Sequence, residues 1–348
     1  DASSVHVKRW VAAMAARGLD VVVGTRRPAV LPGAREVVAI RPGSDGAGWF
    51  AALPAVRALA RRVQPRWVHG HYVTSYGLWA SSCSAVAPVV LTAWGSDLLV
   101  TPQEAGWRGR VMHWLVGRTL RRAALVTADA ADLLQAARHY GSGARLEEVS
   151  WGADTSRFCP GTPAAGFELD SLRAWEPNYR LPVVLQAFAV LRQARPRASA
   201  VLHMLGGGSQ AAALRAEAAR LGVADHVRFT GRVDDEAMAR TLQRCRVSIS
   251  VPDSDATSVS VLESMACGLP VVATDLPANR QWLDPALLVP RGDAAALAAA
   301  LVRLHDEPAW AAAQGRRNRE RVLADACREQ QMDRMLALYH EVPSRTGR

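Results

Sequence analysis

Residues 250–274 read SVPDSDATSVSVLESMACGLPVVAT. The stretch leaves an apolar strand, passes through a loop of small polar residues into a helix, and returns through the turn Gly268-Leu269-Pro270 to a second apolar strand. Such a loop exposes backbone N–H groups at the positive end of the helix dipole, which suits a diphosphate. The stretch therefore predicts a parallel α/β unit with an anion-binding site at one edge of its sheet.

Apolar strands alternate with amphipathic helices along the whole chain, which is typical of parallel α/β folds. We expect strands at 20–23, 67–70, 89–93, 125–128, 199–205, 227–230, 247–251 and 271–274, and helices including 4–17, 54–63, 209–221, 234–244 and 294–305. The 348 residues are enough for two domains. We predict two Rossmann-like doubly wound domains that face a cleft, joined by a Pro/Gly-rich linker at 159–166.

The start of the chain departs from this rhythm. A doubly wound domain opens on a strand whose loop feeds the first helix, whereas this chain opens on the helix itself. Residues 1–4 would then form the loop that leaves an upstream strand. We therefore expect the first strand of the N-terminal domain to be missing.

Composition limits the setting in which the protein works. Five scattered cysteines without a CxxC pair or a Cys/His cluster predict a reduced environment and no structural zinc. The longest apolar runs are far shorter than the roughly 20 residues that a membrane span needs. The N-terminus lacks the pattern of a secretion signal. We expect a cytoplasmic protein without bound metal or cofactor.

The formal net charge is +10, and the basic excess lies in the first half. A basic face could attract an anionic acceptor, an acidic membrane surface or nucleic acid, but an Arg-rich composition explains the charge as well. We expect no nucleic acid partner and leave open a peripheral contact with the inner face of the membrane. Residues 107–122 place Trp107, Val111 and Trp114 among several arginines, and we interpret them as a core helix with a solvated basic rim. Reversible membrane binding is the alternative.

The stretch 250–274 resembles the donor-binding signature of glycosyltransferase family 4. That signature is an acidic residue, seven intervening positions, a Glu, and then a segment like Ser-Met-Ala-Cys-Gly-Leu-Pro-Val-Val. In the family the first acid contacts the transferred sugar and the Glu holds the ribose, so the resemblance assigns these roles to Asp255 and Glu263. Asp255 is one methylene shorter than the usual Glu. Ser258, Val259 and Ser260 begin the helix and are expected to bind the diphosphate.

The resemblance implies a GT-B architecture, with an acceptor domain at 1–160, a donor domain at 161–327 and a C-terminal helix within 328–348 that crosses back to the first domain. It also implies transfer of a sugar from a nucleotide diphosphate sugar to a hydroxyl acceptor with retention of configuration, without a metal. Asp253-Ser254-Asp255 also spells the Asp-X-Asp pattern that binds a metal in another glycosyltransferase fold. An ordinary capped α/β loop is a further alternative.

Three other segments of the second half are expected near the donor. Gly207 and Gly208 follow a strand and allow close approach of a nucleotide. Gly231 and Arg232 border the expected base pocket. Two arginines, Arg173 and Arg180, lie where family 4 places the cations that stabilise the leaving diphosphate, with Tyr179-Arg180 in place of a Lys-Gly pair.

Polar side chains of the first half follow its strands and are assigned to the acceptor side. They are His71, Tyr72 and Ser75 after one strand, together with Ser4 and His6 at the first helix. Thr92-Ala93-Trp94-Gly95-Ser96-Asp97 resembles the family's His-Gly-X-Asp element, with Trp94 in the place of the His. Asp97 is expected to orient an acceptor hydroxyl or the sugar, and the cap of the following helix is its alternative role.

Two other functions remain open on the sequence alone. A nucleotide-sugar epimerase can share the architecture, although no acid/base residues for it are evident. A noncatalytic sugar-nucleotide-binding protein would fit the departures at Asp255 and Tyr179. The sequence identifies neither the base, the sugar, the acceptor nor the oligomeric state, because these depend on a few side chains in loops.

Overall fold

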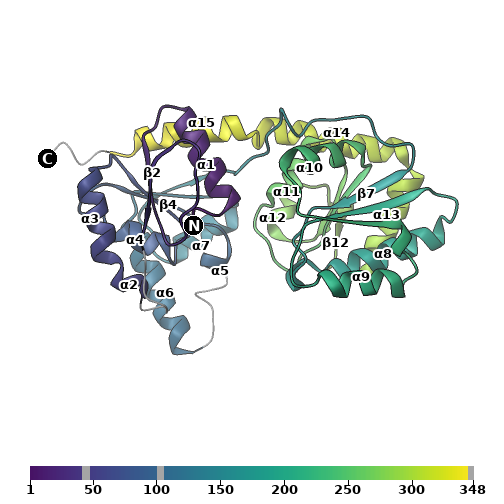
Figure 1. Cartoon of the computed structure of the whole chain (residues 1–348), viewed down its shortest axis with the longest axis horizontal. Helices are drawn as coiled ribbons and strands as arrows, with labels where there is room; N and C mark the ends of the chain where they lie inside the picture. Colours follow the sequence, from purple (N-terminus) through teal and green to yellow (C-terminus); the bar gives the residue numbers. More distant parts are fainter. Residues whose placement is uncertain (41–47, 100–105, 344–348) are drawn as a thin grey trace. The chain divides into compact units, whose positions relative to one another are not determined.

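The computed structural model describes residues 1–40, 48–99 and 106–343. They form two compact units (Figure 1). The first unit comprises Asp1–Trp151 together with the residues from Glu329 onward, and the second comprises Gly152–Arg328. Every named strand pair in both units is parallel, as the alternating sequence predicts.

The first unit contains two sheets. Its elements are α1 (Val5–Ala16), β1 (Val21–Thr25), β2 (Ala34–Ala39), α2 (Gly48–Ala51), α3 (Leu53–Val63), β3 (Val68–His71), α4 (Tyr76–Ser82), β4 (Val89–Thr92), α5 (Ser96–Leu99), α6 (Trp107–Leu120), β5 (Leu125–Ala128), α7 (Ala131–His139) and β6 (Arg145–Glu148). Strands β1 and β2 pair with each other, and β3, β4, β5 and β6 form a separate sheet in that order. Strands β4 and β5 are buried along their whole length, as expected for parallel strands covered on both faces.

A cavity of about 490 Å³ separates the two sheets of the first unit, with Val21–Gly24 of β1 on one side and Trp67 and His69 on the other. Asp1 also lines it. The described chain enters α1 through the loop at residues 1–4, as the sequence predicts.

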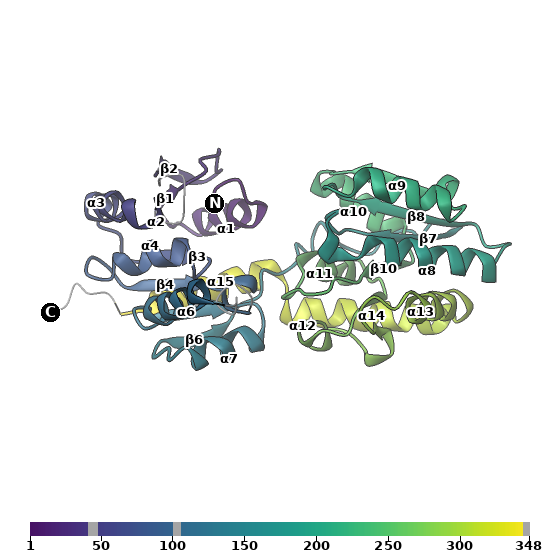
Figure 2. The same cartoon turned by 90° about the horizontal axis from the view of Figure 1, so that it is seen from below.

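The second unit is built on one six-stranded sheet. Its strands are β7 (Phe167–Ser171), β8 (Ala200–Leu205), β9 (Val227–Gly231), β10 (Val247–Ser250), β11 (Val271–Thr274) and β12 (Leu288–Val289), in the order β12-β11-β10-β7-β8-β9. The helices are α8 (Leu181–Ala194), α9 (Ala211–Arg220), α10 (Asp235–Arg244), α11 (Val259–Ala266), α12 (Pro277–Arg280), α13 (Ala294–Asp306) and α14 (Pro308–Asp325). They cover both faces of the sheet (Figure 2). Capping fixes two of their starts, because Asp234 and Asp293 accept hydrogen bonds from the backbone N–H groups of Ala237 and Ala296.

The boundary between the units differs from the sequence-based one at residue 160. The chain passes into the second unit after Trp151, because Ala153 bridges to Cys327 and the fully buried Phe158 packs among the second unit's hydrophobic residues. The expected linker at 159–166 therefore belongs to the second unit, where the N–H of Ala164 donates to the carbonyl of Arg244. The last helix, α15 (Arg328–Glu341), packs Met335 and Tyr339 against the core of the first unit.

The expectation for residues 107–122 is wrong in one respect. The core contacts of α6 lie mainly in its second half, where Val116, Thr119 and Leu120 are buried, whereas Trp107, Val111 and Trp114 are exposed by 65%, 47% and 57%. These three apolar side chains therefore face away from the core. None of the helices in the described ranges has the length and apolar content required to cross a bilayer.

Candidate functional site

The residues predicted to bind the donor come together at one edge of the six-stranded sheet. Arg173 follows β7, Gly206–Gly208 follow β8, Gly231 ends β9, and the loop 251–258 follows β10. Parallel strands place their carboxyl ends at the same edge, and ligands of open α/β sheets bind there. These residues therefore meet because each of them follows a parallel strand of the same sheet.

Arg173 is the centre of the site. It is 7% exposed, and its Nη1 donates to the hydroxyl of Ser258 and, at 3.1 Å, to that of Ser260. Its Nη2 donates to Oδ2 of Asp255 at 2.6 Å. The guanidinium also lies 4.3 Å from the ring centroid of Tyr179. A cation is thus fixed at the start of α11 by one carboxylate, two hydroxyls and an aromatic face.

Asp255 holds this cation in place from a partly buried position. Burial raises the pKa of its carboxyl above the ordinary value, while the neighbouring Arg173 opposes that rise by favouring the charged form. Ser258, at the N-cap of α11, makes no side-chain cap hydrogen bond. The first N–H groups of α11 are therefore left for another partner, and an anion is the partner that a helix N-terminus favours.

The glycine segment packs tightly on the loop that carries Arg173. A Cβ atom on Gly208 would lie 2.5 Å from the carbonyl oxygen of Trp175, and one on Gly206 would lie 2.4 Å from that of Arg173. Gly207 differs, because its Cβ would meet only the Arg232 side chain at 3.5 Å, an ordinary contact. Gly206 and Gly208 are thus required by backbone packing, and Gly207 is the open position beside Arg232.

Further contacts of the loop 173–180 were not anticipated. Glu176 accepts the N–H of Ser209 at 2.9 Å and its hydroxyl at 2.5 Å, which ties this loop to the glycine segment. The carbonyl of Asn178 accepts the N–H of Asp253 at 2.8 Å. These contacts join residues that are far apart in the sequence, so no local pattern predicts them.

The two aspartates of the Asp-X-Asp pattern each pair with one of the two predicted arginines. Arg180 donates from Nε to Oδ2 of Asp253 at 2.7 Å, and Arg173 holds Asp255. Arg180 is exposed and adopts a left-handed backbone with φ of 49°. Each carboxylate therefore already faces a guanidinium, an arrangement that does not suit a divalent cation bound between the two aspartates.

Glu263 lies within α11 and is 2% exposed. Its Oε1 is 3.9 Å from Nη2 of Arg328, so the carboxylate has a cation beside it. Gly231 has φ of 73°, and its carbonyl accepts the N–H of Gly206 at 2.9 Å, which places the end of β9 beside the glycine segment. The side chain of Arg232 is exposed at the same edge.

In the first unit, a cluster of aromatic and histidine rings contains three of the predicted acceptor-side residues. The ring of His6 lies 5.6 Å from that of Trp94, and the ring of His71 lies 6.1 Å from it. Trp151, just after β6, lies 5.0 Å from Trp94 and was not among the predicted acceptor-side residues. Tyr72 is 6.5 Å from Trp94 and has a left-handed φ of 79°, a strained conformation for a residue with a side chain.

Two buried histidines of this cluster, His69 and His71, are neutral. His71 stacks on His69 with 4.1 Å between ring centroids. Burial lowers the pKa of His69 to about 3, and it lowers the pKa of His71 well below its ordinary value, with His69 adding to that effect. Nδ1 of His71 has no hydrogen-bond partner among the described residues. Imidazole nitrogens of this kind accept or donate hydrogen bonds without carrying charge.

The predicted role of Asp97 requires correction. Its side chain is fully buried, and its two oxygens accept the backbone N–H groups of Val73, at 2.7 Å, and Trp94, at 3.0 Å. It therefore fixes the loops after β3 and β4 relative to each other and presents no exposed atom to an acceptor. Ser4 and Ser75 lie at the starts of α1 and α4, where neither makes a side-chain cap hydrogen bond.

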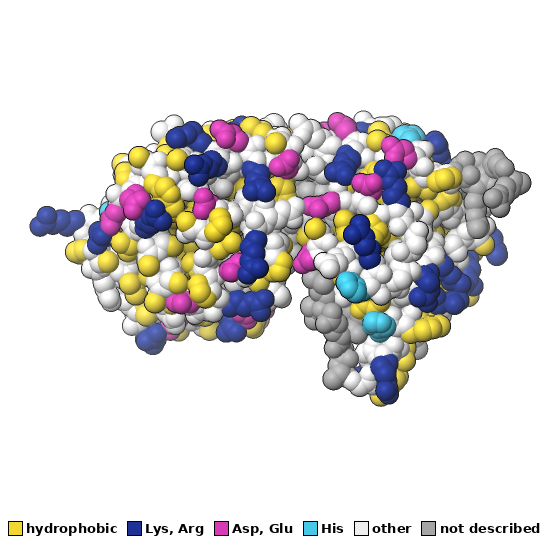
Figure 3. All heavy atoms as spheres, turned by 180° about the vertical axis from the view of Figure 1, so that it is seen from behind, with side chains coloured by type: hydrophobic (Ala, Val, Ile, Leu, Met, Phe, Trp, Pro, Cys, Tyr) yellow, Lys and Arg dark blue, Asp and Glu magenta, His cyan; other side chains and the backbone are white. Residues whose placement is uncertain are grey.

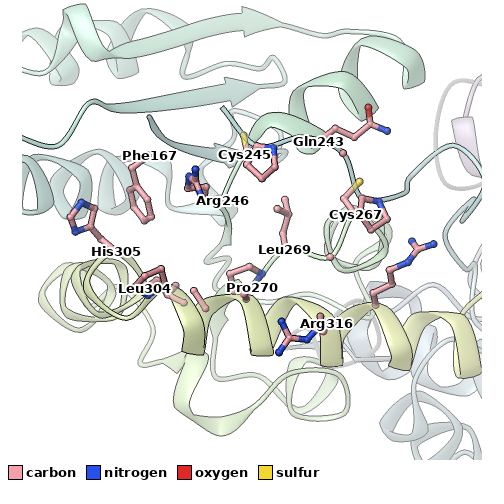
Figure 4. A pocket seen from close by; sticks show the side chains of 18 of the residues that line it. Phe167, Gln243, Cys245, Arg246, Cys267, Leu269, Pro270, Leu304, His305 and Arg316 are labelled. Carbon is pink, nitrogen blue, oxygen red and sulfur yellow. The ribbon is translucent and has the colours of Figure 1, made fainter. Parts of the chain in front are cut away.

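A large cavity of about 710 Å³ lies at the opposite edge of the second unit's sheet (Figure 4). Its lining includes Phe167 at the start of β7, Arg246 just before β10 and Pro270 just before β11. Arg173 and Asp255 instead follow the carboxyl ends of their strands. The cavity is therefore separate from the predicted donor residues.

One group of metal-ligating side chains also forms in the second unit, contrary to the expectation from sequence spacing. Ligand atoms of Glu168, His203 and Cys245 lie within 4.8 Å of one another. Arg244 donates to Oε1 of Glu168 at 2.9 Å, and His203 lies 3.0 Å from its Oε2. Because both carboxylate oxygens already have nitrogen partners, we assign no metal to this group.

Both halves of the chain match known protein families. Residues 172–307 match the glycosyl transferases group 1, and residues 1–130 match the glycosyl transferase 4-like proteins. One relative, the D-inositol 3-phosphate glycosyltransferase of Thermomonospora curvata, is 31% identical over 205 residues. That match covers 54% of this chain and 46% of the relative, so this chain spans about half the length of the protein it resembles. The predicted resemblance is confirmed.

Solved structures share the fold. Sucrose-phosphate synthase from Thermosynechococcus elongatus has a TM-score of 0.79 at 22% identity, over 97% of this chain and 92% of that one. HepE from Anabaena, crystallised with UDP, has a TM-score of 0.81 at 14% identity, over 98% and 97%. The expected architecture of two Rossmann-like domains is therefore confirmed.

Proposed function

Both halves of this chain are related to glycosyl transferases, and on that premise we propose that it transfers a sugar from a nucleotide diphosphate sugar to a hydroxyl acceptor, with retention of configuration. The observation that carries the proposal is the position of Arg173, held by Asp255, Ser258 and Ser260 at the start of α11. A fixed cation beside a helix N-terminus suits a diphosphate leaving group.

The diphosphate would bind at the first N–H groups of α11. Charge grows on its β-phosphate as the bond from this phosphate to the anomeric carbon breaks, and Arg173 stabilises that charge. The acceptor oxygen forms its new bond to the anomeric carbon on the same face, and its proton passes to the departing phosphate oxygen. No protein nucleophile and no metal take part in this scheme, and Arg173 and the dipole of α11 supply the positive charge.

Asp255 restrains Arg173 before the donor binds. Its carboxylate is 2.6 Å from the guanidinium, and in the bound state it would turn to a hydroxyl of the transferred sugar. Glu263 would accept ribose hydroxyls, and Arg232 beside the open Gly207 would border the base. The acceptor side would lie on the aromatic cluster of His6, His71 and Trp94, whose faces suit the apolar side of a sugar ring or of another acceptor.

The proposal is tested by thermal unfolding with UDP, GDP, ADP and dTDP and their sugars, in the presence of EDTA. A ligand at 100 times its Kd stabilises the folded protein by about 2.7 kcal/mol, so a binding nucleotide raises the Tm by several degrees. We expect one base to do so for the wild type, and Glu263→Ala to abolish the shift. Glu320→Ala, at an exposed helical position, is the control that keeps it.

A second measurement separates transfer from binding alone. The nucleotide sugar that stabilises the protein is incubated with it, and release of the free nucleoside diphosphate is followed. Release that requires Arg173 supports a transferase. Binding without release, also when candidate acceptors are added, would instead identify a noncatalytic sugar-nucleotide-binding protein. No stabilisation by any nucleotide would refute the assigned donor site.

A further inference from the structure

Helix α6 carries an apolar stripe that the core of the first unit does not use. Trp107, Val111 and Trp114 are exposed by 65%, 47% and 57%. Their spacing of four and three residues places them on one face of the helix. Large apolar side chains exposed together on one face indicate a surface that contacts something else. We call these three residues the α6 stripe.

The far half of the helix holds the α6 stripe in a fixed orientation. Val116, Gly117, Thr119 and Leu120 are buried, so the helix is anchored to the unit by its last turns. In Figure 1, α6 extends from the sheet of the first unit toward the lower edge of the view. The stripe is therefore presented by a rigid element.

Basic residues surround the α6 stripe. The guanidinium of Arg108 lies 5.6 Å from the ring centroid of Trp107, and that of Arg118 lies 5.6 Å from the ring centroid of Trp114. Burial lowers the pKa of Arg122, and the like charges of Arg118 and Arg57 lower it further. Dark blue basic side chains gather on the first unit, on the right of the view in Figure 3.

These positive charges are not compensated by neighbouring acids. In the part of the chain that the structure describes, Arg57, Arg108, Arg110, Arg118, Arg121 and Arg122 form no ion pair. By contrast, Arg35, Arg62 and Arg145 of the same unit each pair with an aspartate or glutamate. The repulsion of Arg122 by Arg57 and Arg118 is an electrostatic cost that an anionic surface would relieve.

We propose that α6 docks the protein reversibly on an anionic lipid bilayer, with Trp107, Val111 and Trp114 in the interface and the flanking arginines on the lipid headgroups. Tryptophan suits this position because its ring is apolar and its N–H is polar. An apolar stripe with an arginine rim is the pattern of helices that lie in the plane of a membrane interface. Neither the apolar stripe nor the arginine rim alone favours a bilayer over another partner. Together they match the apolar interior and the charged headgroup region of a bilayer.

Cosedimentation of the full chain with sucrose-loaded vesicles tests the proposal. We expect binding to vesicles of phosphatidylcholine with 30% phosphatidylglycerol in 0.1 M salt. Binding to pure phosphatidylcholine, or in 1 M salt, is expected to be at least tenfold weaker, because the screening length falls from about 10 Å to about 3 Å. Equal binding to both vesicle types, or no binding to either, would overturn it.

Two sets of variants locate the contact. Trp107→Gln with Trp114→Gln is expected to weaken vesicle binding about tenfold, with Val190→Gln on α8 as the control for an exposed apolar residue. Arg118→Ala and Arg122→Ala are each expected to weaken it about fivefold, with the exposed Arg240→Ala in the second unit as the control. If the control variants lose as much vesicle binding as the α6 variants do, α6 is not the membrane-binding surface.

Other outcomes of these experiments also support or refute the proposal. If light scattering shows a dimer that Trp107→Gln with Trp114→Gln dissociates, and vesicles do not bind, a second copy covers the α6 stripe and the proposal is wrong. If the double tryptophan variant does not fold, the arginine variants, whose side chains are exposed, still test the charge contribution. Nucleotide stabilisation measured on the same variants keeps this proposal separate from the donor site, because α6 lies in the other unit.

Discussion

Replacing Asp255 by Asn is expected to have opposite effects on binding and on transfer. In the structure the carboxylate lies 2.6 Å from the guanidinium of Arg173, and the two side chains are only 23% and 8% exposed. Two unit charges 4 Å apart attract by about 4 kcal/mol at an effective dielectric constant of 20. A diphosphate must compete with this attraction before it can use Arg173, and it must approach the same carboxylate charge.

The amide of Asn keeps the hydrogen-bonding oxygen but removes the charge. After allowance for screening at the exposed side of Asp255, we expect the affinity for the nucleoside diphosphate to rise about fivefold to tenfold, which corresponds to 1–1.4 kcal/mol. The transfer rate should fall about 100-fold, because a group that faces the reacting sugar has lost its charge. Burial also holds the pKa of Asp255 above its ordinary value. In the wild type, protonation as the pH falls through this raised pKa should therefore also strengthen binding.

Isothermal titration with the nucleoside diphosphate in EDTA, together with a transfer assay, measures both effects. Asp253→Asn is the matched control, because its partner Arg180 is 52% exposed, and its affinity should change less than twofold. If Asp255→Asn weakens diphosphate binding as much as Arg173→Ala does, the carboxylate helps to bind the donor and does not restrain Arg173. That result would refute the reasoning.

Three further outcomes follow from individual contacts. Burial raises the pKa of Asp170 to about 7, so the folded state retains a proton that the unfolded chain loses near pH 4. The wild type should therefore lose about 4 kcal/mol of stability, measured by urea unfolding, as the pH rises from 4 to 7. Asp170→Asn should not show this loss. Gly208→Ala should lower the free energy of unfolding by about 1–3 kcal/mol, because its Cβ would lie 2.5 Å from a backbone oxygen, whereas Gly207→Ala should change it by less than about 1 kcal/mol. Asp97→Ala should lower the free energy of unfolding by about 2–4 kcal/mol, because two buried N–H groups lose their acceptor. It should leave nucleotide stabilisation of the second unit unchanged. A small loss of stability together with a large loss of transfer would instead support the catalytic role first expected for Asp97.

Much of the donor side could be predicted from sequence because its signals are local. Strands, turns and helix starts are encoded by short patterns, and parallel strands bring their carboxyl ends to one edge whatever the details of packing. For this reason Arg173, Asp255 and Ser258 meet although as many as 85 residues separate them along the chain. The close approach of Gly206 and Gly208 to the neighbouring loop follows from the same edge geometry, but only the structure shows that Gly207 is free of it.

The sequence by itself determined the parallel α/β class, most of the strands and the set of residues at the donor edge. Only the tertiary structure decided which side of α6 faces outward, that Asp97 is buried between two loops, and that Trp151 joins His6 and Trp94. Helical periodicity places apolar residues on a common face but does not say whether anything covers that face. A carboxylate after a strand has the same local sequence whether it meets substrate or backbone. Such outcomes depend on contacts between segments far apart in the chain, and these exist only once the chain has packed.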